Sequence, residues 1–137
     1  MDLLYEDYII SDNKALIQVD RVYKLLKTTY WAAKWITEEI TTQAVENSFC
    51  FGIYKDGTLV GFALCVTDYS TMYYLTDVVI DENHRGLGLG KFLTKFVTEH
   101  KLFSHLLGVI ETKDAHRLYE KFGFKTSKGF AMRKDPW

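Results

Sequence analysis

Three glycines alternate with two leucines in one short segment of the chain, and a basic residue stands at each end. The segment reads Arg85-Gly86-Leu87-Gly88-Leu89-Gly90-Lys91, and apolar residues at helical spacing follow it. The first turn of a helix leaves amide N–H groups unpaired, and the helix macrodipole adds partial positive charge there. Glycines let a phosphate approach such amides closely. The segment therefore predicts a strand-to-helix loop that binds the pyrophosphate of a cofactor.

Two common phosphate-binding patterns do not fit this loop. The P-loop pattern needs a glycine where Arg85 stands and a serine or threonine where Phe92 stands. The third glycine of the dinucleotide pattern would fall at Lys91 or at Leu93. On the loop alone, a flexible turn that only caps a helix is the other interpretation.

A second segment, Ala115-His116-Arg117-Leu118-Tyr119-Glu120-Lys121-Phe122-Gly123-Phe124, places a tyrosine on an apolar helix face. Its spacing alone favours Tyr119 as a core residue, because Ala115, Leu118 and Phe122 share that face. A phenol can also act as a proton donor when it is hydrogen-bonded and correctly positioned. Both interpretations of Tyr119 stay open at this point.

Together the two segments resemble the GNAT superfamily of N-acetyltransferases. Residues 85–90 are similar to the superfamily's Q/R-x-x-G-x-G/A motif, and residues 115–124 are similar to its A-x-x-L-Y-E-K-x-G-F segment. The motifs are about 25 residues apart with a short strand between them, as in the superfamily. The resemblance covers residues 49–124, whereas residues 1–48 match only in the number of elements.

The resemblance implies an enzyme that uses acetyl-CoA as donor and acetylates a primary amine of a small molecule or peptide. It implies that the glycine loop holds the CoA pyrophosphate and that a strand before the loop pairs with pantetheine. One amide of that strand would stabilise the oxyanion, and Tyr119 would protonate the leaving thiolate. The cofactor-binding residues implied in this way are Val78, Val79, Ile80, Arg85, Gly86, Leu87, Gly88, Leu89, Gly90, Lys91 and Thr112. Thr112 stands where relatives often carry an asparagine.

The acceptor half of the reaction is less well marked. Many relatives place a glutamate nine residues before the arginine, where this chain has Thr76. Asp77 would point to the opposite face of the strand unless a β-bulge re-aims it, and Asp68 is a weaker candidate base. Tyr30 and Trp31 are expected to contact the substrate, since the matching region roofs the acceptor site in the superfamily. The sequence does not identify the amine.

Two other functions remain possible from the sequence. A CoA-binding sensor or regulatory module without transfer activity is suggested by Thr76 and the lack of an obvious base. A generic nucleotide-binding α/β protein is disfavoured by the failed phosphate patterns.

The elements expected around these residues form a mixed α/β sheet of about six to seven strands, with about four flanking helices and splayed central strands. A hairpin turning at Asp56-Gly57 and a helix capped by Thr37 have the clearest local signals. The expected strands are residues 8–10, 49–54, 58–66, 72–80, 106–110, 124–125 and 129–132, and the expected helices are 20–28, 37–47, 88–100 and 114–122. Asp20 and Asp114 are the expected caps of the first and last helices.

Composition narrows the class of protein. The net charge is −1 and the pI about 6.4, which gives no electrostatic footprint for nucleic acid. Cys50 and Cys65 lie in apolar runs without metal-ligand spacing, so no metal is expected. With no signal peptide and no apolar run of membrane-spanning length, we expect a cytoplasmic protein that does not enter a membrane. We expect residues 1–137 to form one N-acetyltransferase domain, and a homodimer is possible.

Overall fold

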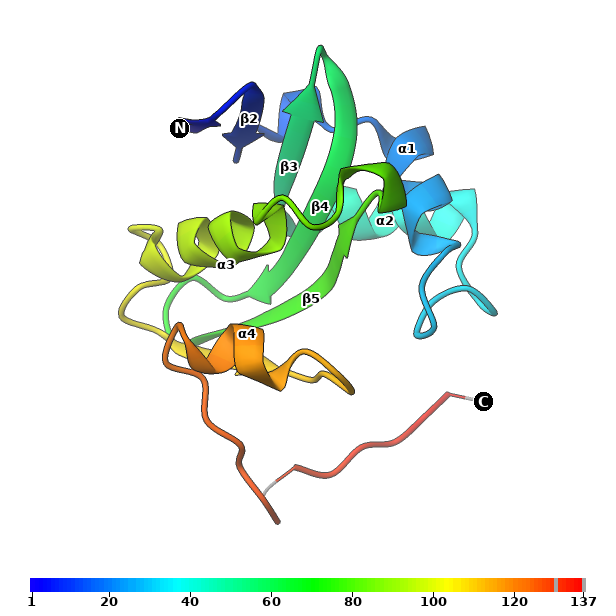
Figure 1. The fold of residues 1–137 in the computed structure, drawn as a ribbon. Coiled ribbons are helices and arrows are strands. Elements are labelled where there is room, and N and C mark those ends of the chain that lie inside the picture. The colour runs from blue at the N-terminus through cyan, green and yellow to red at the C-terminus, as the bar shows by residue number, and fades with distance from the viewer. Residues whose placement is uncertain (130, 137) are drawn as a thin grey trace.

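The computed structural model describes residues 1–129 and 131–136. Its centre is a sheet of six strands in chain order, in which the first five are antiparallel to their neighbours and the sixth is parallel to the fifth (Figure 1). The strands are β1 (Asp2–Tyr5), β2 (Tyr8–Ser11), β3 (Phe49–Lys55), β4 (Thr58–Thr67), β5 (Met72–Ile80) and β6 (Leu107–Ile110). The helices are α1 (Val19–Leu26), α2 (Glu38–Glu46), α3 (Leu89–Glu99) and α4 (His116–Glu120), with 3₁₀ turns η1 (Lys14–Leu16) and η2 (Glu82–His84).

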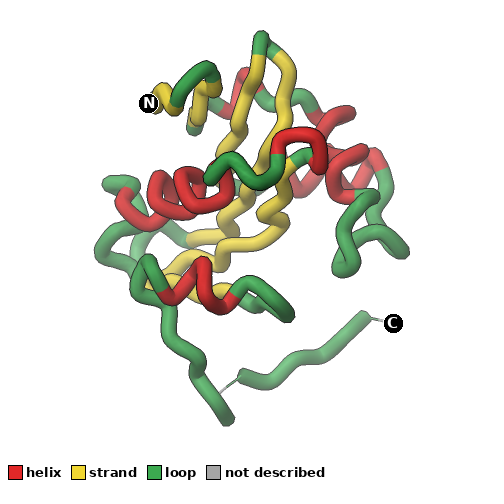
Figure 2. Tube along the Cα trace, in the orientation of Figure 1, coloured by secondary structure: helices red, strands yellow, loops and turns green. Residues whose placement is uncertain are grey.

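Helices cover both faces of the sheet, and a separate apolar core fills each side. Leu93 and Phe96 of α3 and Tyr119 of α4 pack on one face with Phe51. Helices α1 and α2 lie on the opposite face, as Figure 2 also shows. The expected mixed α/β sheet with four helices is confirmed.

Local signals predicted the clearest turns correctly. The β3–β4 hairpin turns at Asp56 and Gly57, which both have positive φ (48° and 80°), the conformation that the Asp-Gly pair favours. Thr37 caps α2, because its hydroxyl accepts a hydrogen bond from the Ile40 amide at 3.1 Å.

Several boundaries differ from the prediction. The exposed edge strand β1 was missed, since its four residues lack a buried alternating face. Asp20 and Asp114 are not the caps: Gln18 precedes α1, and Ala115 precedes α4.

The final strands were also predicted wrongly. Phe124–Lys125 is not in a strand, nor are the described residues of 129–132; residue 130 lies outside the described chain. Gly129 has φ +81°, and Met132 is 98% exposed, so these short segments have no sheet face to bury.

The site depends on how β5 leaves its two neighbours. Residues Met72–Leu75 pair with Leu107–Ile110 of β6, where β6 ends, whereas β5 continues to Ile80 without a strand on that side. On the other side, β4 and β5 change register between the pairs Phe62–Val79 and Leu64–Thr76. One residue of β4 there faces two of β5, which is a β-bulge.

Three further features of the described residues concern membrane-spanning helices, metal sites and thiols. No helix in the described part of the chain is long and apolar enough to cross a membrane. The same residues hold no group of three His, Cys, Asp or Glu side chains suited to a metal ion. Cys50 and Cys65 are buried free thiols.

We expect Leu93→Ala to lower the free energy of unfolding by about 2–5 kcal/mol, because Leu93 is fully buried between α3 and the sheet. Urea unfolding measures the change. Lys95→Ala, on the exposed side of the same helix, is the control and should change stability by less than about 0.5 kcal/mol. Equal losses for both variants would contradict the core assignment.

Candidate active site

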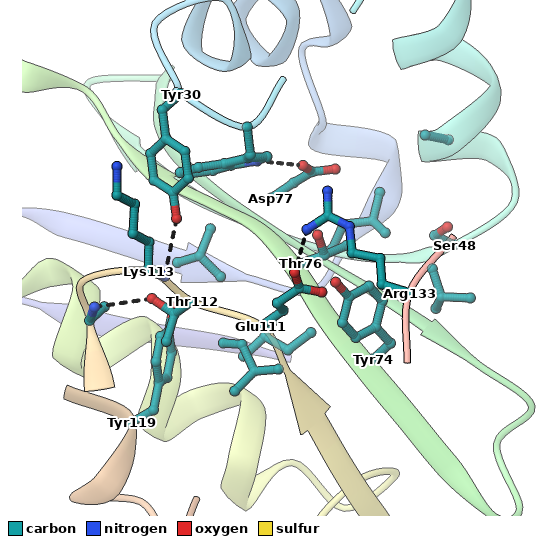
Figure 3. Close-up of a pocket in the computed structure, with 18 of the residues that line it drawn as sticks. Tyr30, Ser48, Tyr74, Thr76, Asp77, Glu111, Thr112, Lys113, Tyr119 and Arg133 are labelled. Carbon is teal, nitrogen blue, oxygen red and sulfur yellow. Dashed lines mark hydrogen bonds and ion pairs between the residues drawn. The ribbon is translucent and has the colours of Figure 1, made fainter. Parts of the chain in front are cut away.

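A cavity of about 970 Å³ opens where β5 and β6 separate (Figure 3). Its walls come from the segment after α1, from β4 and β5, from the segment between β6 and α4, and from residues 133–136. Among the predicted site residues, it brings together Tyr30, Trp31, Asp77, Val78, Thr112 and Tyr119. The glycine loop does not line it.

The bulge in β5 aims Asp77 into this cavity. Asp77 has φ +54°, the left-handed conformation, which aspartate tolerates better than most residues. Strict alternation would have placed Asp77 on the face of Tyr73 and Leu75, but it instead accepts a hydrogen bond from Trp31 Nε1 to Oδ1 at 2.9 Å. Thr76 and Asp77 therefore both line the cavity.

Burial changes the acidity of Asp77. Loss of hydration raises the pKa of its carboxyl above the ordinary value of 3.8, and the Trp31 hydrogen bond opposes this only in part. No described residue donates a hydrogen bond to Oδ2. A partly buried carboxylate with raised pKa and a free oxygen is suited to accept a proton from a bound molecule.

Aromatic rings form the wall opposite β5. Tyr30 and Trp31 meet edge to face, with ring centroids 5.0 Å apart. The Tyr30 hydroxyl accepts from the Lys113 amide at 3.2 Å, and the Lys113 ammonium lies 5.4 Å from the Tyr30 ring centroid. These contacts join the α1–α2 connection to the segment after β6 and close one side of the cavity.

Tyr119 is a core residue that also faces the cavity. It is 6% exposed and packs with Phe124, yet it contributes to the cavity wall. Burial raises the pKa of Tyr119 to about 12, and the nearby Asp114 and Tyr30 act in the same direction. Its hydroxyl makes no hydrogen bond to a described residue, so it is available to a ligand. The two interpretations of Tyr119 are therefore compatible.

Thr112 has a structural partner. Its hydroxyl accepts a hydrogen bond from the Ala115 amide at 3.0 Å and so supports the start of α4, which carries Tyr119. It also lines the cavity.

Sequence reasoning did not identify Glu111 or Arg133 as residues of the cavity wall. Glu111 follows directly after β6, and Arg133 comes from the C-terminal segment; Arg133 Nη1 donates to Glu111 Oε1 at 2.5 Å. Parallel pairing of β5 and β6 would have indicated Glu111, since it extends the pair Leu75–Ile110 by one residue. No signal in the sequence connects Arg133 with this place.

The glycine loop has the backbone of an anion site. Gly86 and Gly88 have φ +78° and +83°, and Gly88 is the N-cap of α3. The first intrahelical bond runs from the Phe92 amide to the Gly88 carbonyl at 3.1 Å, so the preceding amides of the first turn lack helical partners. The exposed Lys91 lies in that turn.

Neighbouring side chains hold the loop in place. Tyr5 of β1 donates to the Leu87 carbonyl at 2.7 Å and stacks on Phe92 with centroids 3.8 Å apart. Arg85 Nε donates to the Ile80 carbonyl at 3.0 Å, which links the loop to the end of β5.

The strand segment Val78–Ile80 has one buried and two partly buried side chains and one open backbone edge. Val78 and Ile80 pack against one core and Val79 lies in the other. β4 occupies one edge of this segment, whereas β6 pairs with β5 only as far as Leu75. The remaining edge can accept an extended ligand through main-chain hydrogen bonds.

Comparison with known proteins agrees with this geometry. The acetyltransferase (GNAT) family matches residues 16–124. A protein of Gibberella zeae assigned as an acetyltransferase is 30% identical, over 90% of this chain and 82% of its own length. The crystal structure of a Xanthomonas campestris protein assigned to the same family superimposes with a TM-score of 0.86 and 32% identity, covering 94% of both chains. An Elizabethkingia anophelis GNAT acetyltransferase with acetyl-CoA bound has a TM-score of 0.66 at 17% identity, covering 90% of this chain and 79% of its own.

The raised pKa of Asp77 has a consequence for stability. The folded state holds this proton at pH values where the unfolded state has lost it, so the contribution of Asp77 to stability falls as pH rises above the ordinary value of 3.8. Asp77→Asn cannot titrate, and it keeps an oxygen that can accept from Trp31. We expect the variant's stability relative to the parent to increase between about pH 4 and pH 8, measured by urea unfolding. A difference that is constant or shrinks would contradict the assignment.

Proposed function

This chain belongs to the GNAT family of acetyltransferases, and from that premise we propose that it transfers the acetyl group of acetyl-CoA to a primary amine bound between β5 and β6. The observation that carries the proposal is the bulge at Asp77. The bulge turns Asp77 into the cavity that Tyr119 also lines. This supports Asp77 as a proton acceptor and Tyr119 as a proton donor in one site.

Acetyl-CoA is the acetyl donor of the family, and it supplies a thioester whose carbonyl carbon accepts the amine and whose sulfur leaves. The residues present fit this donor. The amides after Gly86 and Gly88, with Arg85 and Lys91, would hold the pyrophosphate at the start of α3. The open edge of Val78–Ile80 would pair with the extended pantetheine arm and direct one amide at the thioester oxygen.

Asp77 would prepare the acceptor. An alkyl ammonium must lose a proton before its nitrogen can attack, and Asp77 Oδ2 is the acceptor for that proton. Burial favours the neutral form of both the carboxyl and the amine, so transfer within the cavity is easier than the values in water suggest. Trp31 keeps the carboxylate oriented through its bond to Oδ1.

Tyr119 would complete the reaction. Burial keeps its phenol protonated, with a pKa of about 12, so the proton is present when the thiolate forms. The same low-polarity surroundings destabilise a thiolate, which increases its demand for that proton. The atoms balance: the amine nitrogen gains the acetyl carbon, the C–S bond breaks, and the sulfur receives the proton of Tyr119. The second proton, which the nitrogen loses on becoming an amide, would restore the Tyr119 phenol.

A CoA-binding sensor without transfer activity is the competing function. Thr76 suggests this alternative, because it stands where many relatives have a glutamate. The bulge supplies a carboxylate from the next residue instead, and this favours the enzyme. A screen of primary amines that follows thiol release from acetyl-CoA separates the two: a sensor would be stabilised by acetyl-CoA and release no thiol with any amine.

We expect Tyr119→Phe to lower kcat by about 100-fold or more and to change the affinity for acetyl-CoA by less than about twofold. The phenol makes no hydrogen bond to a described residue, so the fold should not suffer. Single-turnover thiol release and calorimetric titration provide the two readouts. Tyr69→Phe, on the exposed β4–β5 turn, is the matched control. An unchanged kcat would remove Tyr119 from the mechanism.

Two glycines allow a matched test of the anion site. Gly57 and Gly86 have φ of +80° and +78°, and a Cβ at either would meet no atom within 4 Å. Alanine at either position should therefore cost a similar 1–2 kcal/mol of strain, by a rough estimate. Only Gly86→Ala is expected to weaken acetyl-CoA binding, by about tenfold, because its methyl group enters the space for the phosphates. Equal affinities of the two variants would place the pyrophosphate elsewhere.

A further inference from the structure

The outer part of the acceptor cavity carries a second carboxylate, Glu111. Extension of the β5–β6 register by one residue puts Glu111 beside Thr76, one residue before Asp77. Strand spacing and rise then separate the backbones of Glu111 and Asp77 by roughly 6 Å, and divergence of the strands increases this. One cavity therefore presents two carboxylates at different places (Figure 3).

The guanidinium of Arg133 forms an ion pair with Glu111. Arg133 donates through Nη1 to Glu111 and through Nε to Asp135. Glu111 and Arg133 are 57% and 59% exposed, and an ion pair this exposed is worth less than about 1 kcal/mol. A bound ligand with a suitable cation can displace the guanidinium.

Without this C-terminal segment the cavity wall is anionic. Apart from that segment, the acidic residues Asp77, Glu111 and Asp114 outnumber the one basic residue, Lys113. Lys113 is itself turned onto the ring of Tyr30.

The aromatic ring of Tyr74 lines the same cavity as the two carboxylates. The pKa of Tyr74 is raised by burial and further by the charges of Glu111 and Asp77, while Arg133 lowers it. Tyr74 therefore lies within the fields of all three groups. With Tyr30 and Trp31 it gives the cavity aromatic walls, which suit an alkyl chain with cationic ends.

We propose that Glu111 is a specificity-determining residue that binds a second positive charge of the acceptor, and that Arg133 occupies this position until the acceptor displaces it. The acceptor class is then an aliphatic diamine or a longer oligoamine. One nitrogen is acetylated beside Asp77, and the other stays protonated on Glu111. This inference rests on the proposed acetyl transfer and identifies its substrate class.

Three amines with the same four-carbon chain test the proposal: 1,4-diaminobutane, n-butylamine and 4-aminobutanoate, which differ only in the far end. We expect kcat/KM to be about tenfold higher for the diamine than for butylamine, and lowest for the carboxylate. Glu111→Gln should remove the preference for the diamine by raising its KM about tenfold, with little change for butylamine.

Substitution of Arg133 should have the opposite effect on the KM of the diamine. Arg133→Gln should lower the KM of the diamine, since the competing cation is gone, and leave butylamine unaffected. Glu99→Gln, an exposed carboxylate at the end of α3, is the control for the loss of one negative charge. Thermal unfolding of each variant verifies the fold.

The outcomes separate the two proposals. A preference for 4-aminobutanoate that disappears in Arg133→Gln would overturn the inference and make Arg133 the recognising group. Equal effects of Glu111→Gln on all three amines would also overturn it. If no amine releases thiol, acetyl transfer to these acceptors fails, and binding decides the inference: in the presence of CoA, the diamine should raise the melting temperature more than butylamine does, and Glu111→Gln should abolish that difference.

Discussion

The separation of β5 from β6 after Leu75 is the constraint on which the rest of the site depends. A parallel pair would otherwise continue and fill both edges of β5 with main-chain partners. Because pairing stops, Thr76–Ile80 keeps a free edge, and the cavity forms in the gap. On the edge that pairs with β4, the same segment contains the β-bulge. The bulge moves Asp77 off the sheet face on which strict alternation would place it. In the proposed reaction, one strand would thereby offer its backbone to one ligand and its side chains to another.

Both sides of the sheet support this arrangement. The α3 face supplies the first turn of the helix and, through Phe51, Leu93 and Phe96, a rigid base beneath it. The opposite face carries Trp31, whose indole donates a hydrogen bond to the partly buried carboxylate of Asp77. Tyr5 ties the edge of the sheet to the glycine loop, so even an exposed strand contributes to the shape of the site.

Sequence reasoning succeeded where a signal is local. Thr37 and the Asp56-Gly57 turn act through neighbouring backbone groups, and both were predicted correctly. It also placed the glycine loop at the start of a helix and Tyr119 on the buried face of another, since both lie in continuous segments with a clear helical period. The positions of Glu111 and Arg133 follow from contacts between distant segments, which no periodicity encodes. The bulge at Asp77 is a backbone conformation that the alternation of side chains along a strand does not encode. From the sequence, a bulge was only the condition under which Asp77 would point toward the acceptor.

If the main chain binds the donor and side chains bind the acceptor, as proposed above, an evolutionary consequence follows. Hydrogen bonds from a strand edge and a helix start do not depend on which side chains the residues carry, provided that the glycines and the backbone path persist. Substitutions at cavity-wall positions such as Tyr74 or Glu111 would therefore alter which amine is accepted and leave the proposed donor site intact. A scaffold of this kind can acquire a new acceptor in single mutational steps, without passing through a form that has lost its acetyl donor.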